Sequence, residues 1–145
     1  MKLRPATAAD VPALAAIAAE CYQVTFVDFL DPMALAGRNV EFFTSYFPDV
    51  IARVQVAELD GSVKGFSQVT KSHLDMLFVA LDAHGTGVGS ALLRAAESAG
   101  VNTLECFRDN RTARDFYERR GWRLARSYER PFIGEIRAFV LYEKR

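Results

Sequence analysis

The chain of 145 residues is long enough to bury a sizeable core, and we expect residues 1–145 to form a single domain. Its 18 Lys and Arg residues balance its 18 Asp and Glu residues, which argues against a nucleic-acid partner because binding a phosphate backbone needs a basic face. No apolar run approaches the roughly 20 residues of a membrane helix, and the first residues lack the apolar core of a signal peptide, so we expect a cytoplasmic protein without a membrane partner.

The chain opens with a short strand, Lys2–Pro5, and a helix follows it. Thr7 or Asp10 can cap this helix, because side-chain oxygens of these residues accept from free N–H groups at a helix start. Apolar residues then recur at helical spacing, at Val11, Leu14, Ile17 and Cys21.

A second helix is expected to begin at Asp31-Pro32 and to end at Pro48, since proline suits the start of a helix and disrupts its interior. The segment Val24–Leu30 between the two helices is aromatic and irregular. The face of the second helix carries Leu35, Phe42, Phe43 and Tyr46.

The hydrophobic period changes to that of strands after Pro48. Arg53–Glu58 alternates as a strand, Asp60-Gly61 marks a hairpin turn, and Lys64–Thr70 is the return strand. Leu74–Val79 is nearly continuously apolar, as expected of a central strand covered on both faces.

The remaining elements alternate between helix and strand. A helix runs through Ser98, a strand covers Thr103–Phe107, and another helix covers Arg111–Arg120. Two strands, Trp122–Glu129 and Ala138–Glu143, close the sheet. This order predicts an α/β protein with a mixed sheet and helices on its faces.

The turn His84-Gly85-Thr86-Gly87-Val88-Gly89 joins the apolar strand to the next helix. The first N–H groups of a helix have no internal partner and the helix dipole adds partial positive charge, so such a turn can hold an anion. Glycines let a phosphate approach the backbone closely. The alternative is a tight turn selected for packing, and the turn alone does not decide between the two.

Two other phosphate-binding motifs do not fit this turn. A P-loop needs Lys-Ser or Lys-Thr after its glycines, and neither pair follows here. The dinucleotide motif G-x-G-x-x-G would place its last glycine at Ser90 when counted from Gly85, or at Leu92 when counted from Gly87. Both nucleotide interpretations therefore fail on spacing.

Metal-binding residues do not cluster in the sequence. Cys21 and Cys106 form no metal spacing, and His73 and His84 stand apart from any partner at ligand distance. We expect no metal site and no disulfide.

The segment Leu77–Leu93 resembles the signature of the GNAT superfamily, the GCN5-related N-acetyltransferases. That signature is an apolar strand, a short loop, [QR]-x-x-G-x-[GA] and a helix. Gly87 and Gly89 match its two small positions, whereas His84 stands where the family usually has Gln or Arg, and Leu81 where it often has Pro.

A second block is similar to later elements of the same family. Leu104–Asn110, Ala113, Phe116-Tyr117-Glu118 and Gly121-Trp122 follow the pattern of its strand, Asn-x-x-Ala, F-Y-E and G-[FW] elements. The likeness covers essentially the whole chain. His73–Phe78 further resembles a small bacterial single-domain subgroup.

The resemblance implies a mixed, mostly antiparallel sheet of six to seven strands flanked by about four helices. In this fold the fourth and fifth strands, here Leu74–Val79 and Thr103–Phe107, splay apart around the pantetheine arm of acetyl-CoA, or coenzyme A, as co-substrate. For Asn110 a helix cap is an equally open role. The implied cofactor-binding residues are Phe78, Val79, His84, Gly85, Thr86, Gly87, Val88, Gly89, Ser90, Asn110 and Ala113.

The resemblance also implies catalytic roles. Tyr117 matches the family's general acid, which protonates the leaving thiolate; from periodicity alone it would be a packed aromatic on a helix face. Glu105 is the first candidate for the base that deprotonates the amine, with a solvent-facing strand residue as the open alternative. His73 and Asp75 are the second candidates. We expect direct attack by the amine in a ternary complex rather than an acyl intermediate on Cys106, which lacks an evident base.

The family places acceptor specificity in the first helices and the last loop, here Val24–Leu30, Met33–Phe47 and Arg130–Arg137. Most aromatic residues there are expected in the core, while Asp28, Asp31 and Glu135 could attract a cationic amine. Arg108, Arg111 and Arg114 are expected on a solvated face, or one of them on the nucleotide 3′-phosphate. The aromatic residues of these segments are Phe26, Phe29, Phe42, Phe43, Tyr46 and Phe132.

Three functions remain open from the sequence. The first is acetylation of a primary amine on a small molecule by a monomer or homodimer. The second is acetylation of a protein N-terminus or lysine on a peptide acceptor, and the presence of Glu105 favours this acceptor. The third is a non-catalytic acyl-CoA-binding module, against which the presence of Tyr117 and Asn110 argues.

Overall fold

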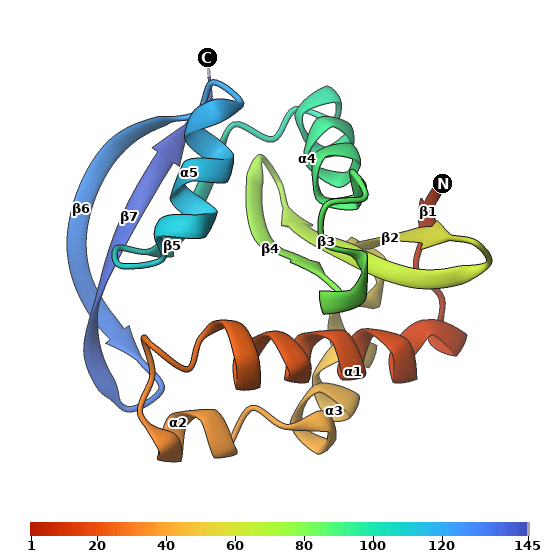
Figure 1. Ribbon diagram of the computed structural model, residues 1–145, viewed down its shortest axis with the longest axis horizontal. Coiled ribbons are helices and arrows are strands. Elements are labelled where there is room, and N and C mark those ends of the chain that lie inside the picture. The colour runs from red at the N-terminus through yellow and green to blue at the C-terminus, as the bar shows by residue number, and fades with distance from the viewer. Residues whose placement is uncertain (145) are drawn as a thin grey trace.

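Seven strands form one continuous sheet in the computed structural model, which describes residues 1–144 (Figure 1). Their order across the sheet is β1-β2-β3-β4-β5-β7-β6. All neighbours are antiparallel except β4 and β5, which confirms the predicted fold class. The strands are β1 Lys2–Pro5, β2 Val54–Leu59, β3 Ser62–Thr70, β4 His73–Val79, β5 Thr103–Phe107, β6 Arg123–Phe132 and β7 Glu135–Glu143.

Residues 1–144 form five α-helices, one more than the number expected. Helices α1 and α3 pack on one face of β2 to β4, and α4 packs on the opposite face. No helix within residues 1–144 combines the length and apolar character needed to cross a membrane. The helices are α1 Val11–Glu20, α2 Pro32–Ala36, α3 Val40–Val50, α4 Val88–Ser98 and α5 Arg111–Arg119.

The extra helix corrects the expected single helix from Asp31 to Pro48. The Asp31 carboxylate caps α2 by accepting from the Ala34 N–H at 3.3 Å, but the helix breaks after Ala36. A second cap, Asn39, then starts α3 through a 2.9 Å bond from the Phe42 N–H. Pro48 lies inside α3, which continues two residues beyond it to Val50, so the helix does not end at the proline.

The predicted hairpin turn is confirmed, whereas Asp10, the N-cap of α1, makes no side-chain hydrogen bond to the first N–H groups of that helix. The hairpin between β2 and β3 turns at Asp60 and Gly61, both with positive φ, as a two-residue turn requires. Asp10 accepts a 2.7 Å hydrogen bond from the Thr7 N–H ahead of α1 and forms a bidentate pair with Arg4 at 2.8 and 2.9 Å. These contacts tie the start of α1 to β1.

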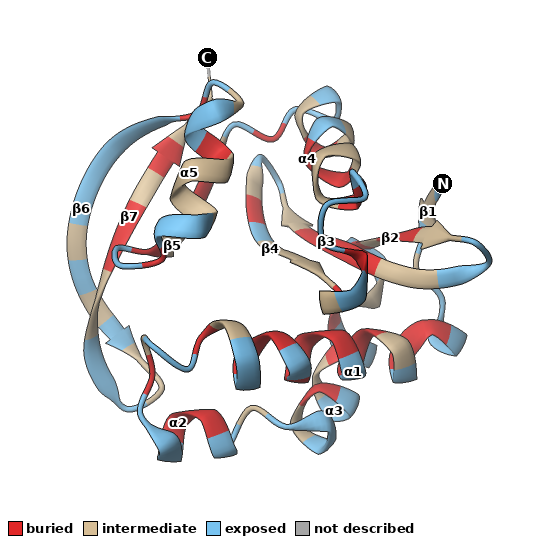
Figure 2. Ribbon diagram, in the orientation of Figure 1, coloured by how far each residue is buried: buried red, intermediate tan, exposed pale blue. Residues whose placement is uncertain are grey.

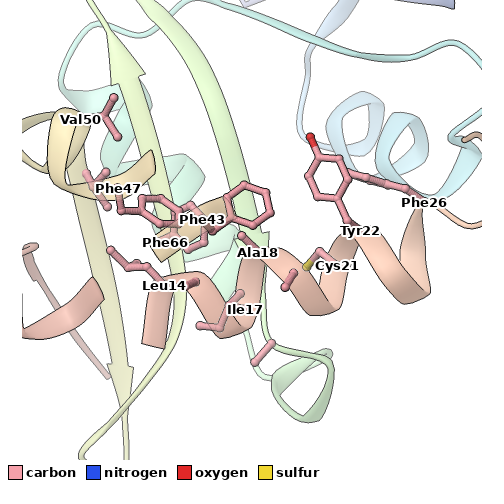
Figure 3. Close-up of a cluster of buried hydrophobic side chains, with 14 of the residues drawn as sticks. Leu14, Ile17, Ala18, Cys21, Tyr22, Phe26, Phe43, Phe47, Val50 and Phe66 are labelled. Carbon is pink, nitrogen blue, oxygen red and sulfur yellow. The ribbon is translucent and has the colours of Figure 1, made fainter. Parts of the chain in front are cut away.

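The main core lies between α1, α3 and the sheet. Figure 2 shows buried residues along the middle of α1, and Figure 3 shows Leu14 and Ala18 facing the rings of Phe43, Phe47 and Phe66. Phe47 and Phe66 meet edge to face, with ring centroids 5.2 Å apart. This packing fixes β3, and β4 beside it, as the rigid wall on which the site is built.

Helix α4 approaches the sheet closely at Gly65 of β3. A Cβ at this position would lie 2.6 Å from Val88 Cγ1 and 3.1 Å from the Phe78 carbonyl oxygen. Gly65 therefore allows the first residue of α4 to rest directly on the sheet.

Candidate active site

The two halves of the sheet part between β4 and β5. These parallel strands pair only through His73 with Thr103 and Leu74 with Leu104. Asp75 is an extra residue in β4, since Val69 pairs with Leu74 and Gln68 with Met76, and such a bulge bends a strand. The strands diverge beyond it and leave a cleft of about 740 Å³.

The glycine turn forms one end of this cleft. Gly85 and Gly87 adopt φ values of 81° and 91°, a left-handed conformation that favours glycine. Five N–H groups in the turn and at the start of α4 make no backbone hydrogen bond within residues 1–144, and their residues line the cleft. They belong to Gly85, Gly87, Val88, Gly89 and Ser90. Free amides at a helix start match the donors that an anion needs.

Two residues of the turn make internal contacts instead. The Thr86 N–H and hydroxyl both donate to the Ala83 carbonyl, at 3.3 and 2.5 Å, and Thr86 does not line the cleft. His84 does line it, but its Nε2 lies 3.2 Å from the Val79 carbonyl oxygen, so this nitrogen carries the proton and donates there. Its ring thus closes the end of β4 rather than facing the free amides with that N–H.

Tyr117 and Asn110 stand on the opposite wall, on β5's side of the cleft. The Tyr117 ring is buried, and burial raises the pKa of its hydroxyl. Within residues 1–144 that hydroxyl makes no hydrogen bond, and no buried side-chain oxygen there lacks a partner, so it reaches the open cleft. It therefore keeps its proton at neutral pH and can donate it to a bound molecule.

Asn110 serves as a cap of α5. Its Oδ1 accepts from the Ala113 N–H at 3.2 Å, which confirms the capping role left open by the sequence. Asn110 and Ala113 both line the cleft. The amide nitrogen of Asn110 makes no hydrogen bond to another of the described residues and remains a donor on this wall.

Glu105 lies in the cleft but is already paired. Arg130 donates to both carboxylate oxygens at 2.9 and 2.5 Å, and the Tyr128 hydroxyl donates as well. Burial alone would raise the pKa of Glu105, but the hydrogen bonds from Arg130 and Tyr128 outweigh it and lower that pKa. A carboxylate held in this way is a weak proton acceptor.

The other base candidates differ in access. His73 lies where β4 and β5 are still paired, with Nδ1 2.9 Å from Thr103 Oγ1, and it does not line the cleft. Asp75 does line it, is exposed, and accepts one hydrogen bond of 2.5 Å from the Thr70 hydroxyl. The bulge that opens the cleft thus also presents a carboxylate to it.

The cysteines behave as buried thiols. Burial raises the pKa of Cys21 and of Cys106 to about 12, and both line the cleft. A thiol that stays protonated at neutral pH is a poor nucleophile, which argues against an acyl intermediate on Cys106.

Arg108 and Arg111 are exposed, as expected of a solvated face, and Arg114 is partly buried. Arg108, Arg111 and Arg114 pair with Asp109, Asp115 and Glu118 respectively, and none lines the cleft. Arg120 does line it, with Nη2 2.6 Å and Nε 3.1 Å from Ser90 Oγ. Arg120 is absent from the residues predicted for the site, although its position four residues after Phe116 on the predicted helix places the two side chains side by side.

Aromatic rings wall the end of the cleft away from the glycine turn. Phe26 and Phe132 line it, together with Phe107, whose ring lies 5.4 Å from that of Phe26 and 5.9 Å from that of Phe132. The other four aromatic residues named from the sequence pack in or against the core. Asp31 and Glu135 pair with Arg137 and lie outside the cleft, as does Asp28.

A comparison with known proteins bears on this geometry. Residues 18–140 match the acetyltransferase (GNAT) domain. The chain belongs to the GNAT acetyltransferase family. An acetyltransferase, the predicted enzyme class, is thereby confirmed.

Individual GNAT relatives agree with the family assignment. Over 98 residues, 64% of this chain and 68% of the relative, the sequence is 32% identical to blasticidin-S acetyltransferase from Streptomyces morookaense. A GCN5-related N-acetyltransferase from Rhodopseudomonas palustris is 26% identical, with a TM-score of 0.79 over 99% of this chain and 94% of that chain. PaiA N-acetyltransferase from Thermoplasma acidophilum, solved with coenzyme A, shares the fold at 15% identity, with a TM-score of 0.76 over 99% and 98% of the two chains.

Proposed function

We propose that this GNAT chain transfers the acetyl group of acetyl-CoA to a primary amine of a small molecule, by direct attack in a ternary complex. The observation that carries the proposal is a single cleft with free backbone amides at one end and the Tyr117 hydroxyl on its wall. The amides suit a diphosphate, and the opening between β4 and β5 suits an extended arm lying along the β4 edge as an added strand would. The family match and the coenzyme A complex of a structural neighbour support this co-substrate.

The residues of this chain divide the work along the cleft. Gly85 and Gly87–Ser90 hold the diphosphate, and Phe78 and Val79 pair with the arm through their backbone. The Asn110 amide donates to the arm from the other wall. A backbone N–H of β4 beyond the bulge polarises the thioester carbonyl, which is the electrophile that acetyl-CoA supplies.

Tyr117 protonates the sulfur as the bond to the acetyl group breaks, because its hydroxyl reaches the cleft and carries its proton at neutral pH. Asp75 takes the amine proton through water, since it is exposed in the cleft and has no cationic partner within residues 1–144. Glu105 is the first candidate from the sequence, but its pairing with Arg130 favours a role in shaping the acceptor end. His73 lies outside the cleft and is the weakest of the three candidates.

The acceptor is proposed to be a small molecule for two reasons. The relative from Streptomyces morookaense is named for blasticidin-S rather than for a protein. The acceptor end is walled by Phe26, Phe107 and Phe132, which suits a compact amine with an apolar part.

Tyr117→Phe tests the proposal. Thiol release from acetyl-CoA is measured across a panel of small amines and peptides, and coenzyme A binding is measured by calorimetry. We expect kcat to fall by about a hundredfold or more with unchanged coenzyme A affinity, the range typical of a lost general acid. Tyr46→Phe is the matched control, because its hydroxyl bonds Gln68 away from the cleft. Equal turnover in Tyr117→Phe and the wild type would remove Tyr117 as the acid, and activity on peptides alone would replace the small-molecule acceptor.

A further inference from the structure

Arg120 is the uncompensated cation of the cleft. Two arginines line it, and Arg130 is neutralised by its bidentate pair with Glu105. Within residues 1–144 no ion pair involves Arg120; its three hydrogen bonds go to the neutral Ser90 hydroxyl and the Phe116 carbonyl. A charge that none of the described residues neutralises, at the edge of a ligand cleft, suits an anion that comes with a ligand.

The guanidinium is also held in a fixed place. It lies 3.8 Å from the centroid of the Phe116 ring, a stacking that arginine makes readily. Nε and Nη2 donate to Ser90 Oγ, and Nη1 donates to the Phe116 carbonyl at 2.9 Å. A guanidinium has more N–H groups than these contacts use, so donors remain for a ligand.

The place is next to the free amides. Ser90, which anchors Arg120, lies in the first turn of α4 and has one of the free N–H groups. Gly89 beside it faces the Phe116 ring, since a Cβ on Gly89 would lie 3.5 Å from that ring. Arg120, Phe116 and the start of α4 therefore form one continuous wall of the cleft.

His84 does not direct its Nε2–H toward the free amides. It occupies the position where the GNAT signature has Gln or Arg, and its Nε2 donates to the Val79 carbonyl instead of toward the amides. No side chain of the turn places a fixed cation beside the free amides, whereas the Arg120 guanidinium lies next to them through its contact with Ser90.

We propose that Arg120 binds a phosphate group of coenzyme A and supplies, from the C-terminal end of α5, the positive charge that the glycine turn lacks. The inference rests on the proposed co-substrate and adds a specific residue to its binding. The diphosphate and the nucleotide 3′-phosphate are the two sources of this phosphate chemistry, and the closeness of Ser90 favours the diphosphate.

The test compares coenzyme A and 3′-dephospho-coenzyme A binding by calorimetry in the wild type, Arg120→Gln, Arg120→Lys and Arg119→Gln. Arg119→Gln is the matched control, because this substitution removes an equal charge from the adjacent, exposed position outside the cleft. We expect Arg120→Gln to weaken coenzyme A binding about tenfold or more, as for a lost charged hydrogen bond, Arg120→Lys to recover part of the loss, and Arg119→Gln to stay within about twofold.

The two ligands and the salt dependence separate the outcomes. An equal loss for both ligands assigns Arg120 to the diphosphate, and a loss confined to coenzyme A assigns it to the 3′-phosphate; either supports the proposal. The loss should shrink as salt rises toward about 1 M, since salt screens a charge–phosphate contact. A loss that persists in high salt and is as large in Arg120→Lys would make Arg120 only a tie between α5 and Ser90 and overturn the proposal, as would binding unchanged in Arg120→Gln. A wild type that binds neither ligand would instead overturn the proposed function itself.

Discussion

Gly65→Ala tests whether the close contact between α4 and the sheet sets up the cleft. The added methyl would lie 2.6 Å from Val88 Cγ1, 3.1 Å from the Phe78 carbonyl oxygen and 3.2 Å from Leu92 Cδ1. The carbonyl belongs to β4 and the two side chains belong to buried residues of α4, so none can move away freely. Overpacking of this kind typically costs about 1–3 kcal/mol.

Two effects of the same substitution oppose each other. Gly65 does not have a positive φ, so alanine suits its backbone and gains about 0.4–1 kcal/mol by restricting the unfolded chain. The steric cost exceeds this gain, because the contact at 2.6 Å is far inside normal packing distance. We therefore expect a net loss of about 1–2 kcal/mol in unfolding free energy.

The position of Gly65 predicts a second effect, on binding. The start of α4 carries the free amides of Val88, Gly89 and Ser90, and the methyl pushes against Val88. Coenzyme A affinity should fall together with stability. Urea unfolding gives the first quantity and calorimetry the second.

Gly37→Ala is the matched control. Its added methyl would meet only carbonyl oxygens at 3.8 Å, at the end of α2 and outside the cleft. We expect it to be neutral or slightly stabilising, with unchanged coenzyme A binding. If Gly65→Ala were as stable as Gly37→Ala and bound coenzyme A as tightly, the argument that this contact positions α4 would be refuted.

Two further predictions concern carboxylates. The pairing with Arg4 lowers the pKa of Asp10 to about 2. The stabilising contribution of Asp10 is therefore complete above the ordinary aspartate pKa and is lost as pH falls toward 2. Urea titration should show that the difference in unfolding free energy between wild type and Asp10→Asn shrinks as pH falls from about 4 to about 2, and a constant difference would contradict the pairing. Asp75→Asn should lower kcat at least tenfold with little change in melting temperature, whereas Glu105→Gln should mainly lower the melting temperature because it leaves Arg130 unpaired; the reverse pattern would restore Glu105 as the base.

The hydrophobic period predicted most of the fold because each element is amphipathic against one core. Thr103–Phe107 was placed to the residue, and the Asp60-Gly61 turn was identified, since positive φ at two successive positions leaves few residue choices. The break in the second helix was missed because Asn39 acts as a cap only through its contact with the Phe42 N–H. Nothing in the apolar pattern marks that contact.

The site was harder to predict because it depends on interruptions of the regular pattern. The bulge at Asp75 reverses which face of β4 each later side chain occupies. Leu74 packs in the hydrophobic cluster that contains Tyr117 of α5, whereas Met76 and Phe78 pack against the cluster that contains the buried residues of α1. A continuous apolar run hides such a reversal, since both faces are buried. The consequence is functional, because the same extra residue ends the pairing with β5 and opens the cleft.

Partners between distant segments were also invisible to spacing. Glu105 and Arg130 are 25 positions apart, and Ser90 and Arg120 are 30 apart, yet each pair decides what its charged member can do. The first pair removes a carboxylate from base chemistry, while the second fixes a guanidinium without neutralising it. The sign of a side chain's charge does not by itself reveal the role of Glu105 or of Arg120. Each role follows from whether the fold already provides a counter-charge.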